Sequence, residues 1–136
     1  MVAYDCRLVH GFPPDSAITY LTYVSEREMY QAFNQIEERF CYTGHTHELE
    51  IISFDSRFIS RTPLSLGTTC LYEENRYMIS IGSVGQPRDG NNNAKYVIWD
   101  TSADIIDVRF IPYDISAVVD KIIAAGLPRT HARRLW

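Results

Sequence analysis

Turn-forming residues divide the middle of this chain, from residue 41 to residue 113, into short apolar runs. Runs of this length that end in glycine, proline or asparagine are typical of β-strands. In order, they read CYTG, LEIISFD, RFISRTPL, TTCLY, RYMISIG, AKYVIWD and IIDVRFIPY. The runs between residues 57 and 82 indicate a β-meander, and the last two, joined through Thr101 to Asp104, predict a hairpin. The fold is therefore expected to rest on β-sheets.

The first third of the chain adds a strand and a helix. The run YDCRLVHG, residues 4–11, alternates like a strand and stops before Pro13 and Pro14, which cannot continue it. Ser25 and Glu28 then form the pattern of a capping box at the start of a helix. The apolar residues that follow at helical spacing are Met29, Phe33, Ile36 and Phe40.

The last segment predicts a second helix. Asp114 is a candidate N-cap, apolar residues recur at helical spacing from Ala117, and Gly126 is a typical C-terminal stop. Pro128 and a last short helical turn follow. Strands and helices together indicate a mixed α/β (α+β) fold, and the length of 136 residues indicates one domain, residues 1–136.

Charge and hydropathy exclude several classes of protein. The formal net charge of −4 argues against a general nucleic-acid or anionic-membrane surface, and Arg129, Arg133 and Arg134 are interpreted as a solvated helix end. The start of the chain lacks a signal-peptide pattern, and no apolar run approaches the roughly eighteen residues of a membrane span. A soluble, cytoplasmic protein is expected.

Cys6, Cys41 and Cys70 are widely spaced and form no C-x-x-C motif. This spacing suggests neither a disulfide framework nor a thiolate zinc site. Buried thiols in a reducing compartment are the simplest interpretation.

Three histidines are the candidate functional residues. His10 ends the first strand, and His45 and His47 flank Thr46 in the loop of GHTHELEI. Histidines two residues apart on extended backbone point the same way, and strand-end loops at one edge of an α/β sheet converge. Three neutral imidazoles can hold a transition metal such as Zn, Mn or Fe, with Gly11 and Gly44 allowing close approach of the backbone.

The ordered series LVHGFP, YTGHTHELEI, ISIGSVGQPRDGNNNAKYVIWD, IPYD and AAGLP resembles the C-terminal half of calcineurin-like metallophosphoesterases, most closely the small prokaryotic phosphodiesterase type. The resemblance implies a sandwich of mixed β-sheets flanked by helices. It also implies a two-metal site that hydrolyses a phosphodiester or phosphomonoester. In this comparison His10 and His45 match the ligands of one metal, and His47 matches a ligand of the other.

The motifs of the family's first half do not occur in this chain. An Asp-x-His pair before His10, a Gly-Asp-x-x-Asp and a Gly-Asn-His are all absent. Without a bridging carboxylate, two cations would repel each other. A full dinuclear site is therefore not expected from one chain. Glu48 is not expected to replace the missing carboxylates, because the next residue on a strand points to the other face.

Three hypotheses follow. In the first, the chain is half of a metal-dependent phosphoesterase and inactive alone, and it is either a cut gene product or the partner of a separately encoded N-terminal half. Alternatively, it is a non-catalytic homo-oligomeric module with at most a vestigial mononuclear site at the three histidines. A mononuclear metal hydrolase is a third possibility, although no general base is evident.

The glycine-rich loop GSVGQPRDGNNN offers one further candidate. Ser83 or Arg88 could contact a phosphate, but glycine and proline at this density first indicate tight turns. The loop is therefore interpreted as structural, and no substrate-binding residue is assigned.

Overall fold

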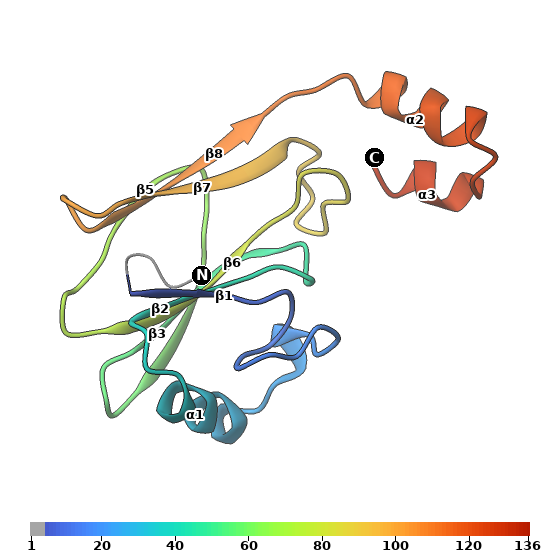
Figure 1. Ribbon diagram of the computed structural model, residues 1–136. Coiled ribbons are helices and arrows are strands. Elements are labelled where there is room, and N and C mark those ends of the chain that lie inside the picture. Colours follow the sequence, from blue (N-terminus) through green and yellow to red (C-terminus); the bar gives the residue numbers. More distant parts are fainter. Residues whose placement is uncertain (1–4) are drawn as a thin grey trace.

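The computed structural model describes residues 5–136, and its elements form three layers: a helix, a larger sheet and a smaller sheet (Figure 1). The strands are β1 (Cys6–Leu8), β2 (Phe40–Thr43), β3 (Leu49–Phe54), β4 (Ile59–Pro63), β5 (Gly67–Cys70), β6 (Arg76–Ile81), β7 (Ala94–Asp100) and β8 (Ile105–Ile111). The helices are a 3-10 turn at Leu21–Tyr23, α1 (Glu26–Gln35), α2 (Ile115–Ala124) and α3 (Arg129–Arg133). Tyr4, where the first predicted strand begins, lies outside the described residues.

Within residues 5–136 the larger sheet has five strands in the order β1-β2-β6-β3-β4. β1, β2 and β6 run parallel, while β3 is antiparallel to both β6 and β4. The predicted meander is therefore wrong. β5 leaves this sheet for the smaller one, and β6 returns to lie between β2 and β3. The mixed sheet places the carboxyl ends of three parallel strands at one edge.

The layer between α1 and the larger sheet is the first hydrophobic core. The predicted capping box is confirmed, because Ser25 accepts from the Glu28 backbone N–H and Glu28 accepts from the Ser25 backbone N–H. Helical periodicity does not extend to Phe40, because α1 ends at Gln35 and Phe40 begins β2. The buried residues of this core are Leu21, Met29, Ala32, Phe33, Ile36, Cys41, Ile52, Phe54 and Met78.

The opposite face of the larger sheet packs on the second sheet, of order β5-β8-β7, whose predicted β7–β8 hairpin is confirmed. The buried residues between the sheets are Phe40, Leu49, Ile51, Leu64, Tyr77, Ile79, Ile106 and Val108. Successive strand residues face opposite layers. Phe40, paired with Tyr77, faces the second sheet, while Cys41, paired with Met78, faces α1. The central strands are therefore buried on both faces.

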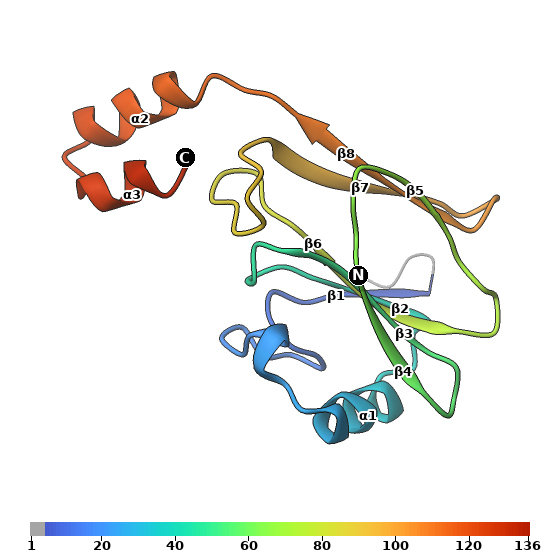
Figure 2. The ribbon, with the colours of Figure 1, turned by 180° about the vertical axis from the view of Figure 1, so that it is seen from behind.

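After β8 the chain leaves the sheets and forms a helical arm, α2 and α3, which projects from the layers (Figures 1 and 2). The predicted N-cap is confirmed, because Asp114 Oδ1 accepts from the Ala117 backbone N–H at 2.9 Å. No residue of α2 is buried, whereas Ala132 and Leu135, at the end of the arm, are 5% and 4% exposed. Among the helices of residues 5–136, none has the length and apolar character to cross a membrane.

The cysteines differ in their surroundings. Cys41 is fully buried, and its burial raises the pKa of the thiol to about 12, so it stays protonated at physiological pH. Cys70 is exposed and Cys6 is half-buried. The expectation of buried thiols therefore holds for Cys41 and is wrong for Cys70.

An ion pair ties the edge strand β1 to the segment that leads into β2. Arg7 Nε and Nη2 donate to the two carboxylate oxygens of Glu38 at 3.0 and 3.1 Å, and Glu38 is 8% exposed. The hydrogen bonds from Arg7, followed by that from the backbone, hold the pKa of Glu38 below its usual value. The bidentate geometry fixes the position of the edge strand.

Loss of the Glu38 charge should destabilise the chain in a pH-dependent way. Because the pKa of Glu38 is lower in the folded state, its stabilisation is present above the unfolded pKa of about 4.3 and is lost as pH falls through the folded value. In urea unfolding, Glu38→Gln should therefore be less stable than wild type at pH 7, and the difference should shrink below about pH 4. Substitution of the exposed neighbour, Glu37→Gln, is the control. An unchanged difference from pH 7 to pH 3 would contradict the ion-pair assignment.

Candidate functional site

The three predicted histidines line one pocket at the carboxyl edge of the parallel strands. His10 follows β1, His45 and His47 follow β2, and the loop of residues 82–93 follows β6. The pocket has a volume of about 570 Å³, and the loop after β6 supplies part of its wall. Strand-end loops therefore converge as the sequence predicts.

Two of the histidines are in direct contact. His10 Nε2 lies 3.1 Å from His45 Nδ1, and the ring centroids are 4.9 Å apart. The Tyr20 ring also packs on His45, with a centroid distance of 4.1 Å. Gly11, directly after His10, has to be glycine, because a Cβ there would lie 2.7 Å from the Ser16 carbonyl oxygen. Gly44 is not under that constraint, since its nearest contact would be 3.5 Å.

The His-Thr-His loop is not extended, which corrects the conformation expected from the sequence. His45 and His47 have φ angles of 63° and 62°, in the left-handed region that residues other than glycine seldom adopt. The Thr46 backbone N–H donates to the Gly44 carbonyl at 2.7 Å and closes a tight turn around His45. Both histidines reach the pocket through this turn, and not through the alternation of a strand.

Thr46 anchors the loop in the interior between the two histidines. It is 4% exposed, and its hydroxyl lies 2.8 Å from that of Ser80, which donates to the Glu48 carbonyl. The Glu48 backbone N–H donates back to Thr46 Oγ1 at 3.3 Å. Each buried hydroxyl therefore has a partner, and this fixed network holds the turn in its unusual conformation.

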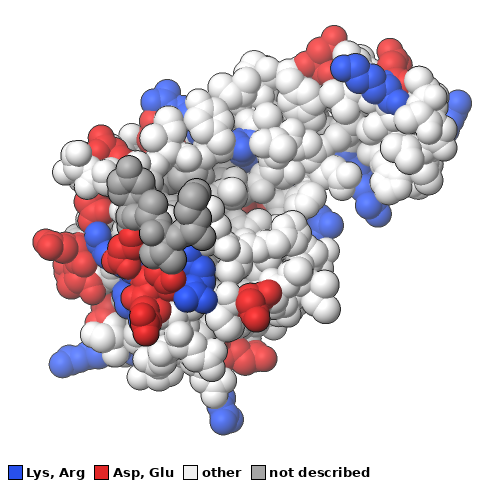
Figure 3. Space-filling view, viewed as in Figure 1, with Lys and Arg blue, Asp and Glu red and all other residues white. Residues whose placement is uncertain are grey.

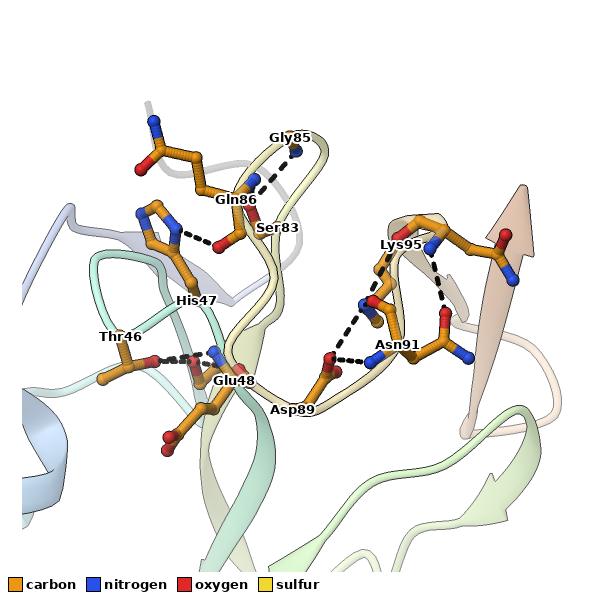
Figure 4. A network of polar contacts seen from close by, with 11 residues as sticks. Thr46, His47, Glu48, Ser83, Gly85, Gln86, Asp89, Asn91 and Lys95 are labelled. Carbon is orange, nitrogen blue, oxygen red and sulfur yellow. Dashed lines mark hydrogen bonds and ion pairs between the residues drawn. The ribbon is translucent and has the colours of Figure 1, made fainter. Parts of the chain in front are cut away.

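The loop after β6 sets the tautomer of the neutral His47 ring. His47 Nδ1–H donates to the Gln86 carbonyl at 2.6 Å, and the Arg88 backbone N–H contacts the His47 carbonyl at 3.4 Å (Figure 4). Since a carbonyl only accepts, the neutral ring carries its proton on Nδ1 and leaves Nε2 as an acceptor. Ser83 Oγ shapes the loop by accepting from the backbone N–H groups of Gly85 and Gln86.

Lys95 on β7 holds the far side of the same loop. Its side chain is 0% exposed, and Nζ lies 3.0 Å from Asp89 Oδ1 (Figure 4). Nζ also donates to the carbonyls of Asn91 and Asn93 at 2.5 and 3.2 Å. A buried ammonium needs such partners to offset its loss of hydration. Lys95 therefore fixes residues 89–93 against the second sheet.

Two donors of the pocket have a spacing that a transition metal could bridge. A cation held at about 2.1 Å by two nitrogens would set them roughly 3.0–3.4 Å apart, which includes the spacing of His10 and His45. The hydrogen bond of His47 to a backbone carbonyl is the usual second contact of a metal-ligating histidine. Within residues 5–136, however, no group of three or more His, Cys, Asp or Glu side chains is arranged to hold a metal.

Glu48 does not complete the ligand set. Its carboxylate points away from His47 (Figure 4), and the residue lines a different pocket, together with Glu50 and Asp89. This orientation agrees with the sequence prediction. The assignment of His10, His45 and His47 as metal ligands remains a prediction, because the structure brings only His10 and His45 into contact.

Sequence reasoning missed several residues of the site. Tyr20 lies in a segment without a motif, and Lys95 sits in a strand where a charged residue is expected to face solvent. The partner of His47 is a backbone carbonyl, which no residue type reveals. The two carbonyls that bind Lys95 are backbone atoms as well, so the asparagines at residues 91–93 gave no signal for that contact.

Substitution of Lys95 should loosen the loop that holds His47. Lys95→Met leaves Asp89 and two carbonyls without their partner and should lower the free energy of unfolding by about 2 kcal/mol. The exposed Lys121→Met is the matched control. Long-range ¹H–¹⁵N spectra of the imidazoles should show His47 as the Nδ1–H tautomer in wild type and as a mixture in Lys95→Met. An unchanged tautomer with normal stability would contradict this role.

Comparison with known proteins gives the fold and site a family context. No protein-family model matches the sequence. An uncharacterized protein of Methanocaldococcus jannaschii is 36% identical over 95 residues, which are 70% of this chain and 37% of that protein. The crystal structure of a metallophosphoesterase from Sphaerobacter thermophilus matches 99% of this chain and 55% of its own, with a TM-score of 0.86 and 29% identity.

This chain spans about half of the solved neighbour and a smaller share of the curated relative. The expected fold, mixed sheets flanked by helices, is confirmed by the structural match. The resemblance to the calcineurin-like metallophosphoesterase family is thus supported by a solved metallophosphoesterase, of which this chain corresponds to about half.

Proposed function

We propose that this chain contributes the histidine ligands to the metal centre of a phosphodiester or phosphomonoester hydrolase. The supporting observation is the meeting of His10 and His45 at 3.1 Å, beside a His47 whose free Nε2 is set by its bond to Gln86. Neutral imidazoles suit Mn, Zn or Fe. The solved neighbour is a metallophosphoesterase, of which this chain covers 55%.

The carboxylate ligands would come from a complementary part of the family fold that these 136 residues do not span. Divalent metal in such a centre supplies charge neutralisation for the phosphoester and an activated water. The residues of this chain position it: His10 and His45 as a pair, and His47 through the loop that Lys95 holds. The chain alone is expected to be inactive.

Cobalt titration tests the ligand assignment. Co²⁺ should bind weakly to the purified chain, and its visible absorption should report nitrogen ligands. His10→Ala and His45→Ala should each weaken binding by at least about tenfold, since each removes one of few donors. His131→Ala, on α3 outside the pocket, is the control. Equal cobalt binding by all four proteins would contradict the assignment of His10 and His45 as metal ligands.

Activity with bis-p-nitrophenyl phosphate and manganese separates the hypotheses. The chain alone should not exceed a His10→Ala control, and a complementary fragment with the missing motifs should restore hydrolysis that depends on His10. Robust hydrolysis by the chain alone, abolished in His10→Ala, would instead favour the mononuclear hydrolase.

A second candidate is a non-catalytic homo-oligomeric module, and the helical arm favours it. α2 buries none of its residues, and Ile123 and Leu127 are 44% and 52% exposed. Apolar surface on a projecting element is often an interface. On this reading, sedimentation should find a dimer or larger species at tens of micromolar, and Ile123→Asp should dissociate it. A monomer at that concentration would remove the candidate.

A further inference from the structure

A second, smaller pocket lies next to the pocket of His10, His45 and His47, here called the histidine pocket. It is formed where the end of the helical arm approaches the loop after β6. Its volume is about 330 Å³. The lining residues are Gln86, Pro87, Arg88, Arg133, Arg134 and Trp136. One wall is therefore the loop after β6, and the other is the end of the arm.

Two links make this arginine pocket, defined by those six residues, continuous with the histidine pocket. Gln86 lines both pockets, and its carbonyl holds His47. Leu135 is 4% exposed and lines the histidine pocket, while its neighbours Arg134 and Trp136 line the arginine pocket. A ligand at the histidines therefore has the arginines within reach along one surface.

The arginine pocket is positively charged in a chain whose net charge is −4. No Asp or Glu side chain lines it, and none of its three guanidinium groups forms an ion pair with an Asp or Glu of residues 5–136. Figure 3 shows blue side chains on either side of the notch between the arm and the body. The Asp and Glu side chains of the described residues that form ion pairs do so with other cations, so these three arginines have no such counter-ion.

Arg88 is held toward the site by aromatic contacts. Its guanidinium lies 5.6 Å from the centre of the Tyr20 ring, and Tyr20 packs on His45. Cation–π contact keeps the charge in place and leaves its N–H groups available. Arg133 and Arg134 are exposed at the end of α3, as the sequence led us to expect, and both also line the arginine pocket.

We propose that the arginine pocket binds a second phosphate group of the substrate, so that the preferred phosphoester carries two phosphate groups. This proposal rests on the proposed function, in which the first phosphate lies at the histidines. Guanidinium groups bind phosphate oxygens in bidentate pairs, and three of them without carboxylate partners match a multiply charged anion. The substrate class is thus a bisphosphorylated or diphosphate compound.

Isothermal titration calorimetry with inorganic pyrophosphate tests the pocket without turnover. The full chain, ending at Trp136 with no added residues, is titrated in a chelator so that no metal contributes. Pyrophosphate should bind at least about tenfold more tightly than orthophosphate or sulfate, because it can bind several arginines at once. Arg88→Gln and the double variant Arg133→Gln/Arg134→Gln should each weaken pyrophosphate binding by about tenfold or more.

One control locates the binding. Arg129→Gln, an exposed arginine of α3 outside the pocket, should bind like wild type, and circular dichroism verifies that each variant is folded. Equal weakening in Arg129→Gln or equal affinity for all three anions would overturn the proposal, as would absence of pyrophosphate binding. Failure of the cobalt and hydrolysis tests would refute the proposed function, whereas these titrations refute the arginine pocket alone.

Discussion

Parallel pairing of β1, β2 and β6 is the constraint on which the rest of the structure depends. Parallel strands end at the same edge of a sheet, so the loops after these three strands meet although they are far apart in sequence. The contacts of His10 with His45 and of His47 with Gln86 form for this reason. The packing that keeps the strands in register is therefore also what aligns the site: α1 covers one face, and the second sheet covers the other.

Within that frame, side chains outside the candidate ligand set give the histidines their positions. The hydroxyls of Thr46 and Ser80 hold a turn in which two histidines adopt positive φ. The buried ammonium of Lys95 holds the loop whose carbonyl orients His47. Unfavourable backbone angles persist where the surroundings over-determine them, and such positions concentrate at functional sites. The polar network and the strained turn thus form one unit.

Much of the fold could be predicted from the sequence, because its signals are local. The capping box at Ser25, the N-cap at Asp114 and the β7–β8 hairpin each depend on residues close in the chain. The departure of β5 to the second sheet could not be predicted, since strand order depends on distant pairing. The turn around His45 and the burial of Lys95 also escaped prediction, because tertiary hydrogen bonds override the preference of each residue.

The helical arm is only weakly attached to the rest of the domain. Neither hydrophobic core contains a residue of α2 or α3, and the arm's buried contribution is limited to Ala132 and Leu135. Elements with so few buried contacts open at a lower free energy than the domain as a whole. The arm carries Arg133, Arg134 and Trp136. One wall of the arginine pocket therefore forms only in molecules whose arm lies against the sheets. An anion bound there would favour the conformation in which the arm lies against the sheets.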